Sequence, residues 1–183
     1  MWRQPVKRWN VLAATLPVVG LSLASACTPP QTTPGSIILD VNTSNQGTFQ
    51  VAAGVPFTRT TVFQSGGTDP LSSGVVVLTP EEVVIETGGT GTRSLQVWLY
   101  LSDSSESQDE ACGGAISDEY GPFTVTIDDD DNVIGLEAGT TELTSRSLEL
   151  LQSGQPVRLC VKVVSDFDIA VTFNQVSFEL IKQ

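Results

Sequence analysis

Histidine is absent from this chain of 183 residues. Its absence excludes Ser-His-Asp and Cys-His catalysis, and it removes the imidazole ligands that zinc, copper and iron sites commonly use. A nucleophilic serine would have no visible base. Paired carboxylates serve as acid and base in glycoside hydrolysis, but the many acids here single out no pair. We therefore expect a protein that is not an enzyme.

Positive charge is scarce as well, with nine Lys and Arg against 21 Asp and Glu. Three of the basic residues, Arg3, Lys7 and Arg8, lie before position 27, whereas all the acids lie after it. The remainder carries six basic and 21 acidic residues, a net charge of −15. Such a field repels polyanions, so we expect no nucleic-acid partner. Cations, neutral sugars and other proteins stay open, as does acidity that simply maintains solubility.

Cysteine occurs three times, and Cys27 has the most informative surroundings. It follows the apolar segment 11–26, which is long enough for the core of a signal peptide and short for a membrane span. Basic residues precede this segment, and small residues close it as Leu23-Ala24-Ser25-Ala26. The first 27 residues therefore resemble the signal of a bacterial lipoprotein precursor.

This resemblance implies removal of residues 1–26, lipidation of Cys27 and anchoring to the membrane of the cell envelope. Thr28 stands where an inner-membrane lipoprotein often has Asp, so the resemblance favours the outer membrane where one exists. The usual leucine lies one place early, at Leu23. Ala24-Ser25-Ala26 also fits ordinary signal peptidase, which would release a soluble secreted protein instead.

Residues 27–35 contain three prolines and are interpreted as a tether, because such a segment is extended and builds no core. At about 3.1 Å per residue it would hold the domain some 20 to 25 Å from the bilayer. Residues 36–183 are long enough for one domain with its own core.

Lipidation of Cys27 would leave Cys112 and Cys160 as a pair. In an oxidising compartment we expect them to form a disulfide. Thiols of a metal or redox site are the alternative, which the absence of histidine and of a C-x-x-C motif disfavours.

The domain is rich in Val, Thr, Ile and Phe, with period-two alternation broken every eight to twelve residues by turn formers. This pattern predicts an all-β fold, a two-sheet β-sandwich of the Ig-like or jelly-roll-like kind. One short helix is expected within 140–152. The expected strands are 36–42, 48–53, 57–64, 75–78, 82–86, 94–102, 123–127, 133–137, 157–164 and 169–181. The last changes phase at Asn174-Gln175, which predicts a bulge or tight turn there.

Cys160 shares the polar face of its strand with Arg158 and Lys162. A bond to Cys112 would therefore lie on the outside of the sandwich. We expect the long segment 103–121 to fold across that outer face, a common place for function.

An aromatic strand gives the first candidate binding site. Leu95, Val97, Leu99 and Leu101 form its apolar face, which places Gln96, Trp98 and Tyr100 together on the other. Two aromatic rings beside an amide suit a sugar-binding platform for a polysaccharide. The alternatives are a central strand covered on both faces, or a segment 103–121 that lies over Trp98.

The acidic loops give the second candidate binding site. The run Asp128, Asp129, Asp130 and Asp131 gathers carboxylate oxygens, which suits calcium as a possible cofactor. Val133 replaces the turn glycine of an EF-hand loop, so the motif is incomplete, and a solvated turn is the alternative.

Together these features predict an envelope-anchored, non-enzymatic lipoprotein with a binding or structural β-sandwich. Its partners would be the membrane, through the lipid anchor, and a polysaccharide or an envelope protein. A carbohydrate-binding module and a calcium-stabilised adhesion or assembly domain are the alternatives.

Overall fold

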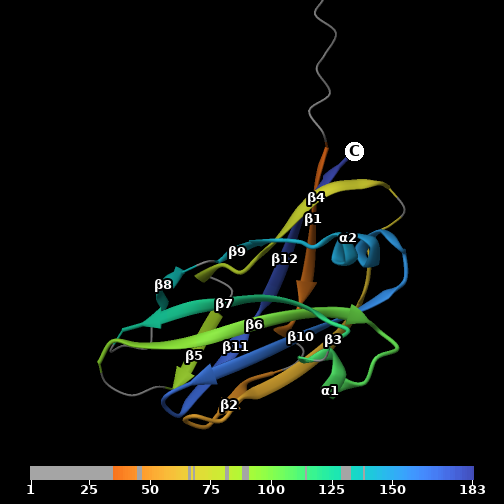
Figure 1. The fold of residues 1–183 in the computed structure, drawn as a ribbon. Coiled ribbons are helices and arrows are strands. Elements are labelled where there is room, and N and C mark those ends of the chain that lie inside the picture. Colours follow the sequence, from red (N-terminus) through yellow and green to blue (C-terminus); the bar gives the residue numbers. More distant parts are fainter. Residues whose placement is uncertain are drawn as a thin grey trace, which may run out of the picture. The chain divides into compact units, whose positions relative to one another are not determined.

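The computed structural model describes residues 35–44, 47–65, 67, 69–80, 83–87, 91–113, 115–128, 133–137 and 139–183. Cys27 and the expected signal and tether lie outside these residues. The described chain contains twelve strands and two helices (Figure 1). In chain order they are β1 (Ser36–Asn42), β2 (Phe49–Val51), β3 (Phe57–Gln64), β4 (Leu71–Val77), β5 (Val83–Thr87), β6 (Arg93–Asp103), α1 (Gln108–Ala111), β7 (Asp118–Ile127), β8 (Val133–Glu137), β9 (Thr140–Glu142), α2 (Ser145–Gln152), β10 (Pro156–Ser165), β11 (Ile169–Phe173) and β12 (Gln175–Lys182).

One layer of the fold is a five-stranded antiparallel sheet in the order β3-β10-β6-β7-β8. Its central strands alternate as expected, because β6 buries Leu95, Val97, Leu99 and Leu101 while Gln96 stays exposed. Val157, Leu159, Val161 and Val163 of β10 are buried beside them. Alternation thus gives this sheet an apolar inner face and a more polar outer face.

The opposite layer consists of two sheets, β1-β12-β4-β9 and β2-β11-β5. Three segments connect these two sheets: β1 leads to β2, β4 leads to β5, and β11 leads back to β12 through Asn174 alone. The carbonyl of Asn174 accepts the N–H groups of Thr43 (3.0 Å) and Ser44 (3.2 Å), which ties two of the segments together at this bend. The interruption expected at Asn174-Gln175 is therefore where the chain changes sheet.

Aromatic rings join the two layers. Phe63 of β3 stacks on Phe178 of β12 with ring centroids 6.0 Å apart, and Phe49 lies 5.5 Å from Phe57 and 5.4 Å from Phe173. These rings belong to one buried cluster that runs between the layers. The all-β sandwich is thus confirmed, with one of its layers divided into two sheets.

Helix α2 packs against β4 and β6, one strand from each layer, and so closes one end of the sandwich (Figure 1). Thr144 caps it by accepting the N–H of Ser147 at 3.1 Å. The carboxylate of Asp118 accepts hydrogen bonds from the Thr144 and Ser147 hydroxyls, each at 2.6 Å. A negative charge at this end also suits the helix dipole. The expected helix is confirmed, although residues 140–142 form β9 instead.

Two strands begin earlier than the sequence indicated. Strand β4 starts at Leu71, because Ser73 and Gly74 pair with Ile181 and Leu180 of β12 despite their low strand propensity. Strand β7 starts at Asp118 and accommodates Gly121 and Pro122 opposite a register shift between Val97 and Leu99. A Cβ at Gly121 would lie 2.7 Å from the Val97 carbonyl oxygen at a φ of +116°, so this close approach requires glycine.

Candidate functional site

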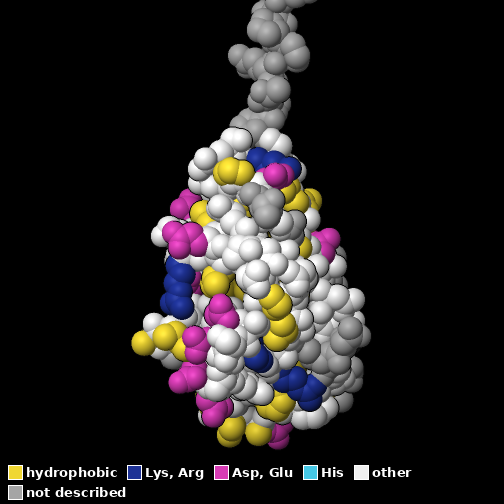
Figure 2. Space-filling model, turned by 90° about the vertical axis from the view of Figure 1, so that its right-hand side faces the viewer, with side chains coloured by type: hydrophobic (Ala, Val, Ile, Leu, Met, Phe, Trp, Pro, Cys, Tyr) yellow, Lys and Arg dark blue, Asp and Glu magenta, His cyan; other side chains and the backbone are white. Residues whose placement is uncertain are grey.

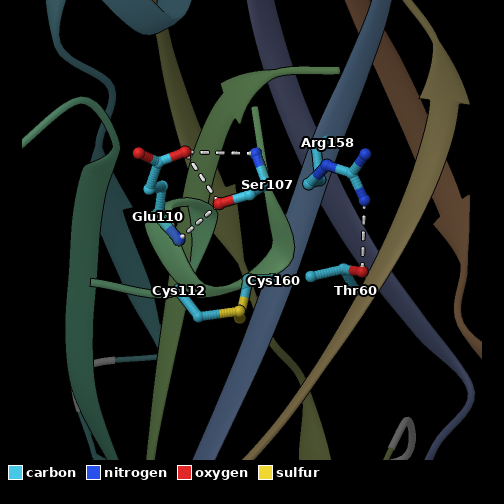
Figure 3. The surroundings of a disulfide bond; sticks show 6 residues. All are labelled: Thr60, Ser107, Glu110, Cys112, Arg158 and Cys160. Carbon is cyan, nitrogen blue, oxygen red and sulfur yellow. Dashed lines mark hydrogen bonds between the residues drawn. A yellow bond between two sulfur atoms is a disulfide. The ribbon is translucent and has the colours of Figure 1, made fainter. Parts of the chain in front are cut away.

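A disulfide holds a short helical segment against the outer face of the five-stranded sheet (Figure 3). Cys112 is bonded to Cys160 with a Cα–Cα distance of 5.4 Å, which confirms the expected pair. Helix α1 precedes Cys112 and contacts β3, β6 and β10. We call residues 104–113 the cap, because their helix contacts those three strands. The sequence predicted such a crossing for 103–121, but residues 118–121 belong to β7 instead.

Local hydrogen bonds explain why the cap turns into a helix at Ser107. The Ser107 hydroxyl accepts the N–H of Glu110 at 3.3 Å and donates to the Glu110 carboxylate at 2.7 Å. That carboxylate also accepts the N–H of Ser107 at 3.4 Å, which completes a capping box (Figure 3). Sequence reasoning missed this helix, although the Ser-x-x-Glu pattern was the available signal.

Arg158 fastens the start of the cap. Its Nη2 donates to the Ser104 carbonyl oxygen at 2.8 Å, and its Nη1 donates to the Thr60 hydroxyl at 3.4 Å. The turn before the helix is ordered by Asp103, whose Oδ1 accepts the N–H of Ser105 at 2.8 Å. This hydrogen bond holds the pKa of the Asp103 carboxyl below its usual range. Arg158 and the disulfide thus attach the cap to β10 at two points.

Tyr100 lies on the outer face of β6, next to the disulfide-bonded Cys160 of β10. Cys160 is the cross-strand partner of Tyr100 on one side, and Glu119 is its partner on the other. Tyr100 is only 2% exposed. Burial raises the pKa of Tyr100 well above its ordinary value, and the hydrogen bond and negative charge of Glu119 raise this pKa further.

The expectation that Tyr100 forms half of an exposed aromatic platform is therefore wrong. The strand parity was right, since Gln96, Trp98 and Tyr100 do share the outer face of β6. The cap attached at Cys160 covers the Tyr100 end of that face. Gln96 remains exposed and Trp98 is partly buried.

Lys162 adjoins Trp98 on the same outer face as its cross-strand partner. Its Nζ lies 5.1 Å from the centroid of the Trp98 ring and 5.9 Å from that of Tyr100, positions that permit cation–π attraction. The exposed part of the site therefore combines an amide, an indole and an ammonium group. The sequence placed Lys162 on this face, but the strand register was needed to place it beside Trp98.

Only part of the acidic loop belongs to the described residues. Asp129, Asp130 and Asp131 lie outside the described residues, and Asp128 follows β7 directly, where its carbonyl oxygen accepts a hydrogen bond from Arg93 at 3.3 Å. Among the described residues no group of three or more Asp, Glu or Cys side chains is arranged to hold a metal ion. The calcium role of Asp128 to Asp131 stays a prediction.

The surface charge of one face of the domain is visible in Figure 2. On the face shown, acidic side chains are spread among apolar and neutral ones, and basic side chains form small separate groups rather than a stripe. Neither helix in the described part of the chain has the length and hydrophobicity needed to span a membrane.

No protein-family model matches the chain, and no curated protein matches it either. Among solved structures, it is similar to one of Desmodium yellow mottle tymovirus, with a TM-score of 0.28, 8% identity and coverage of 100% of this chain and 98% of that one. It is also similar to the VP2 subviral particle of infectious bursal disease virus, with a TM-score of 0.24 and 16% identity over 91% of this chain and 46% of that one. At such low TM-scores these similarities carry no argument about function.

Replacing both Cys112 and Cys160 by Ser is expected to lower the free energy of unfolding by about 4 kcal/mol, because the disulfide closes a loop with a sequence separation of 48. Denaturant unfolding of the variant and the parent measures this difference. Both proteins keep Cys27, so they differ only in the Cys112–Cys160 bond. Equal stability of the double variant and the parent would contradict the structural role of the cap.

Tyr100 should make the domain sensitive to alkali. Its pKa is raised in the folded state above the ordinary value of 10.0, so above about pH 10 the unfolded chain binds fewer protons than the folded one. Stability from this group is complete below pH 10 and falls as pH rises. Urea unfolding from pH 8 to 11 should show a shallower loss for Tyr100→Phe than for the parent. An equal loss of stability with pH in both proteins would refute the raised pKa of Tyr100.

Proposed function

We propose that the chain is an exported, lipid-anchored envelope protein whose β-sandwich acts by binding or as a structural component, without catalysis. The observation that carries the proposal is the pairing of Cys112 with Cys160. Disulfides of this kind persist in oxidising compartments and are rare in the cytosol. Export to an oxidising compartment would explain why this bond forms and persists.

The same pairing supports lipidation. Two of the three cysteines are joined to each other, so Cys27 alone stays available for a modification at its sulfur. It follows the small residues Ala24, Ser25 and Ala26, as the acceptor cysteine of a lipoprotein does. Simple cleavage at this point is the competing outcome.

Mass spectrometry of the protein from bacterial membranes tests this proposal. We expect an N-terminus at Cys27 that carries a diacylglyceryl thioether, and recovery of the protein with membranes. Cys27→Ser should prevent the modification and block lipoprotein signal peptidase, while Cys112→Ser with Cys160→Ser should leave lipidation intact. An unmodified Cys27 at the N-terminus of a soluble product would refute anchoring and support secretion.

A second candidate function is glycan binding on the exposed part of the outer face. It is favoured by the position of Trp98 on the same outer face as exposed Gln96 and beside the Lys162 ammonium. The indole offers an apolar face for sugar C–H groups, and the two polar side chains offer donors for hydroxyl oxygens. The net charge favours a neutral glycan over an anionic one.

Trp98 fluorescence tests this second candidate, because the other two tryptophans, Trp2 and Trp9, lie in the expected signal. A neutral polysaccharide that binds should shift the emission of the processed protein, and Trp98→Ala should abolish retention on that polysaccharide without lowering the unfolding midpoint. Tyr100→Phe, which alters a covered ring, should retain binding. Emission that is blue-shifted, protected from quencher and unchanged by every neutral polysaccharide would exclude this function.

A further inference from the structure

The four-stranded sheet β1-β12-β4-β9 has a notch beside β4, at the point where β9 ends. Strand β9 pairs only with Val75–Val77 of β4. The chain then leaves the sheet at Leu143, whose N–H donates to the Gly74 carbonyl oxygen at 2.9 Å, and enters α2. In the strand order of the described residues, Leu71–Ser73 therefore have no strand beside them on this side.

A cavity of about 460 Å³ adjoins the notch, and residues of β4, β9, β12 and α2 together with Ser36 line it. Its apolar side is formed by Leu143, Leu148 and Leu180. A Cβ at Gly74 would lie 2.8 Å from Leu180 Cδ2 and 2.9 Å from Leu143 Cδ1, so a larger residue here would require both leucine side chains to shift. The volume falls within the range of sites that hold ligands or side chains of a partner.

Two carboxylates flank the opening. Glu179 of β12 and Glu142 of β9 are both cross-strand partners of Val75, one from each side, and both are exposed. No Lys or Arg lines the cavity in the described part of the chain. Lys182, at the end of β12, is instead paired with Asp69 at 2.5 Å.

Apolar surface continues out of the notch across the same sheet. Ile181 lines the cavity and is 41% exposed, and Ile38, the cross-strand partner of Glu179, is 63% exposed. The surface thus alternates aliphatic side chains with carboxylates. An occupant that complements it needs positive charge and aliphatic groups at a similar spacing.

We propose that the notch is a docking site for a polypeptide segment of a partner protein in which Lys or Arg side chains alternate with aliphatic ones. No strand of the described residues pairs with β4 at Leu71–Ser73 on this side. This edge favours a polypeptide, because an extended segment adds main-chain hydrogen bonds to an edge that no strand occupies. Its aliphatic side chains contact Leu143 and Leu180, and its cations lie between Glu142 and Glu179. The site is separate from the Trp98 face and does not depend on the lipid anchor.

A labelled peptide tests the proposal directly. The probe is fluorescein-Val-Lys-Val-Lys-Val-amide. It is titrated with the purified mature protein, whether that protein is recovered from membranes or from the medium, and binding is followed by fluorescence anisotropy. We expect saturable binding with a Kd below about 1 mM that weakens with added salt. The matched peptide with Glu in place of Lys should not bind, because the carboxylates repel it.

Two test variants, each with a matched control variant, locate the binding. Glu142→Gln combined with Glu179→Gln should weaken binding at least about tenfold, whereas Glu149→Gln combined with Asp166→Asn removes the same charge elsewhere and should not. Ser73→Tyr places a ring in the opening and should abolish binding, while Ser94→Tyr on the other layer should not.

Circular dichroism and thermal unfolding confirm that each variant is folded. Equal binding of the Glu peptide, full affinity in the Glu142 and Glu179 double variant, or no binding at about 1 mM would each overturn the proposal. The Cys27 experiment above has a separate readout, so the failure of one proposal leaves the other unaffected.

Discussion

The antiparallel pairing of β6 with β10 is the constraint on which the rest of the molecule depends. On the inner side it aligns two rows of buried aliphatic residues, such as Leu99 beside Val161, that face the opposite layer. On the outer side the same register places Cys160 beside Tyr100 and Lys162 beside Trp98. A slip of one residue would exchange the two faces and leave the disulfide nowhere to form. Core and outer site are therefore two results of one register.

Much of the fold follows from period-two alternation, because an apolar face that must be buried leaves few arrangements for a strand. Three strands were bounded correctly from the sequence: Ser36–Asn42, Phe57–Gln64 and Val133–Glu137. Strand β4 shows where the argument stops. Ser72, Ser73 and Gly74 have little intrinsic preference for a strand, and they adopt one because β12 offers a partner. A local pattern cannot report a neighbour that is a hundred residues away.

The candidate site divides in the same way between what is local and what is not. Counting cysteines was enough to predict the Cys112–Cys160 bond, and strand parity was enough to place both on the outside. The burial of Tyr100 could not be predicted from the sequence, because it depends on how the cap crosses β6 and on the contact with Glu119. The notch could not be predicted either, because it arises where β9 ends before it reaches the beginning of β4. The residues of a strand do not show where the strand beside it ends.

Asn174 has a consequence for how this chain can change over evolutionary time. The larger buried side chains have odd numbers before it, such as Val171 and Phe173, and even numbers after it, such as Val176 and Phe178. This one residue reverses the facing of the strand and also supplies the carbonyl that Thr43 and Ser44 share. Loss of a single codon here would turn the aliphatic side of β12 toward water, whereas most loops of a sandwich absorb such a change. We expect length at this bend to be far more restricted than residue identity, so related sequences should align through it without gaps.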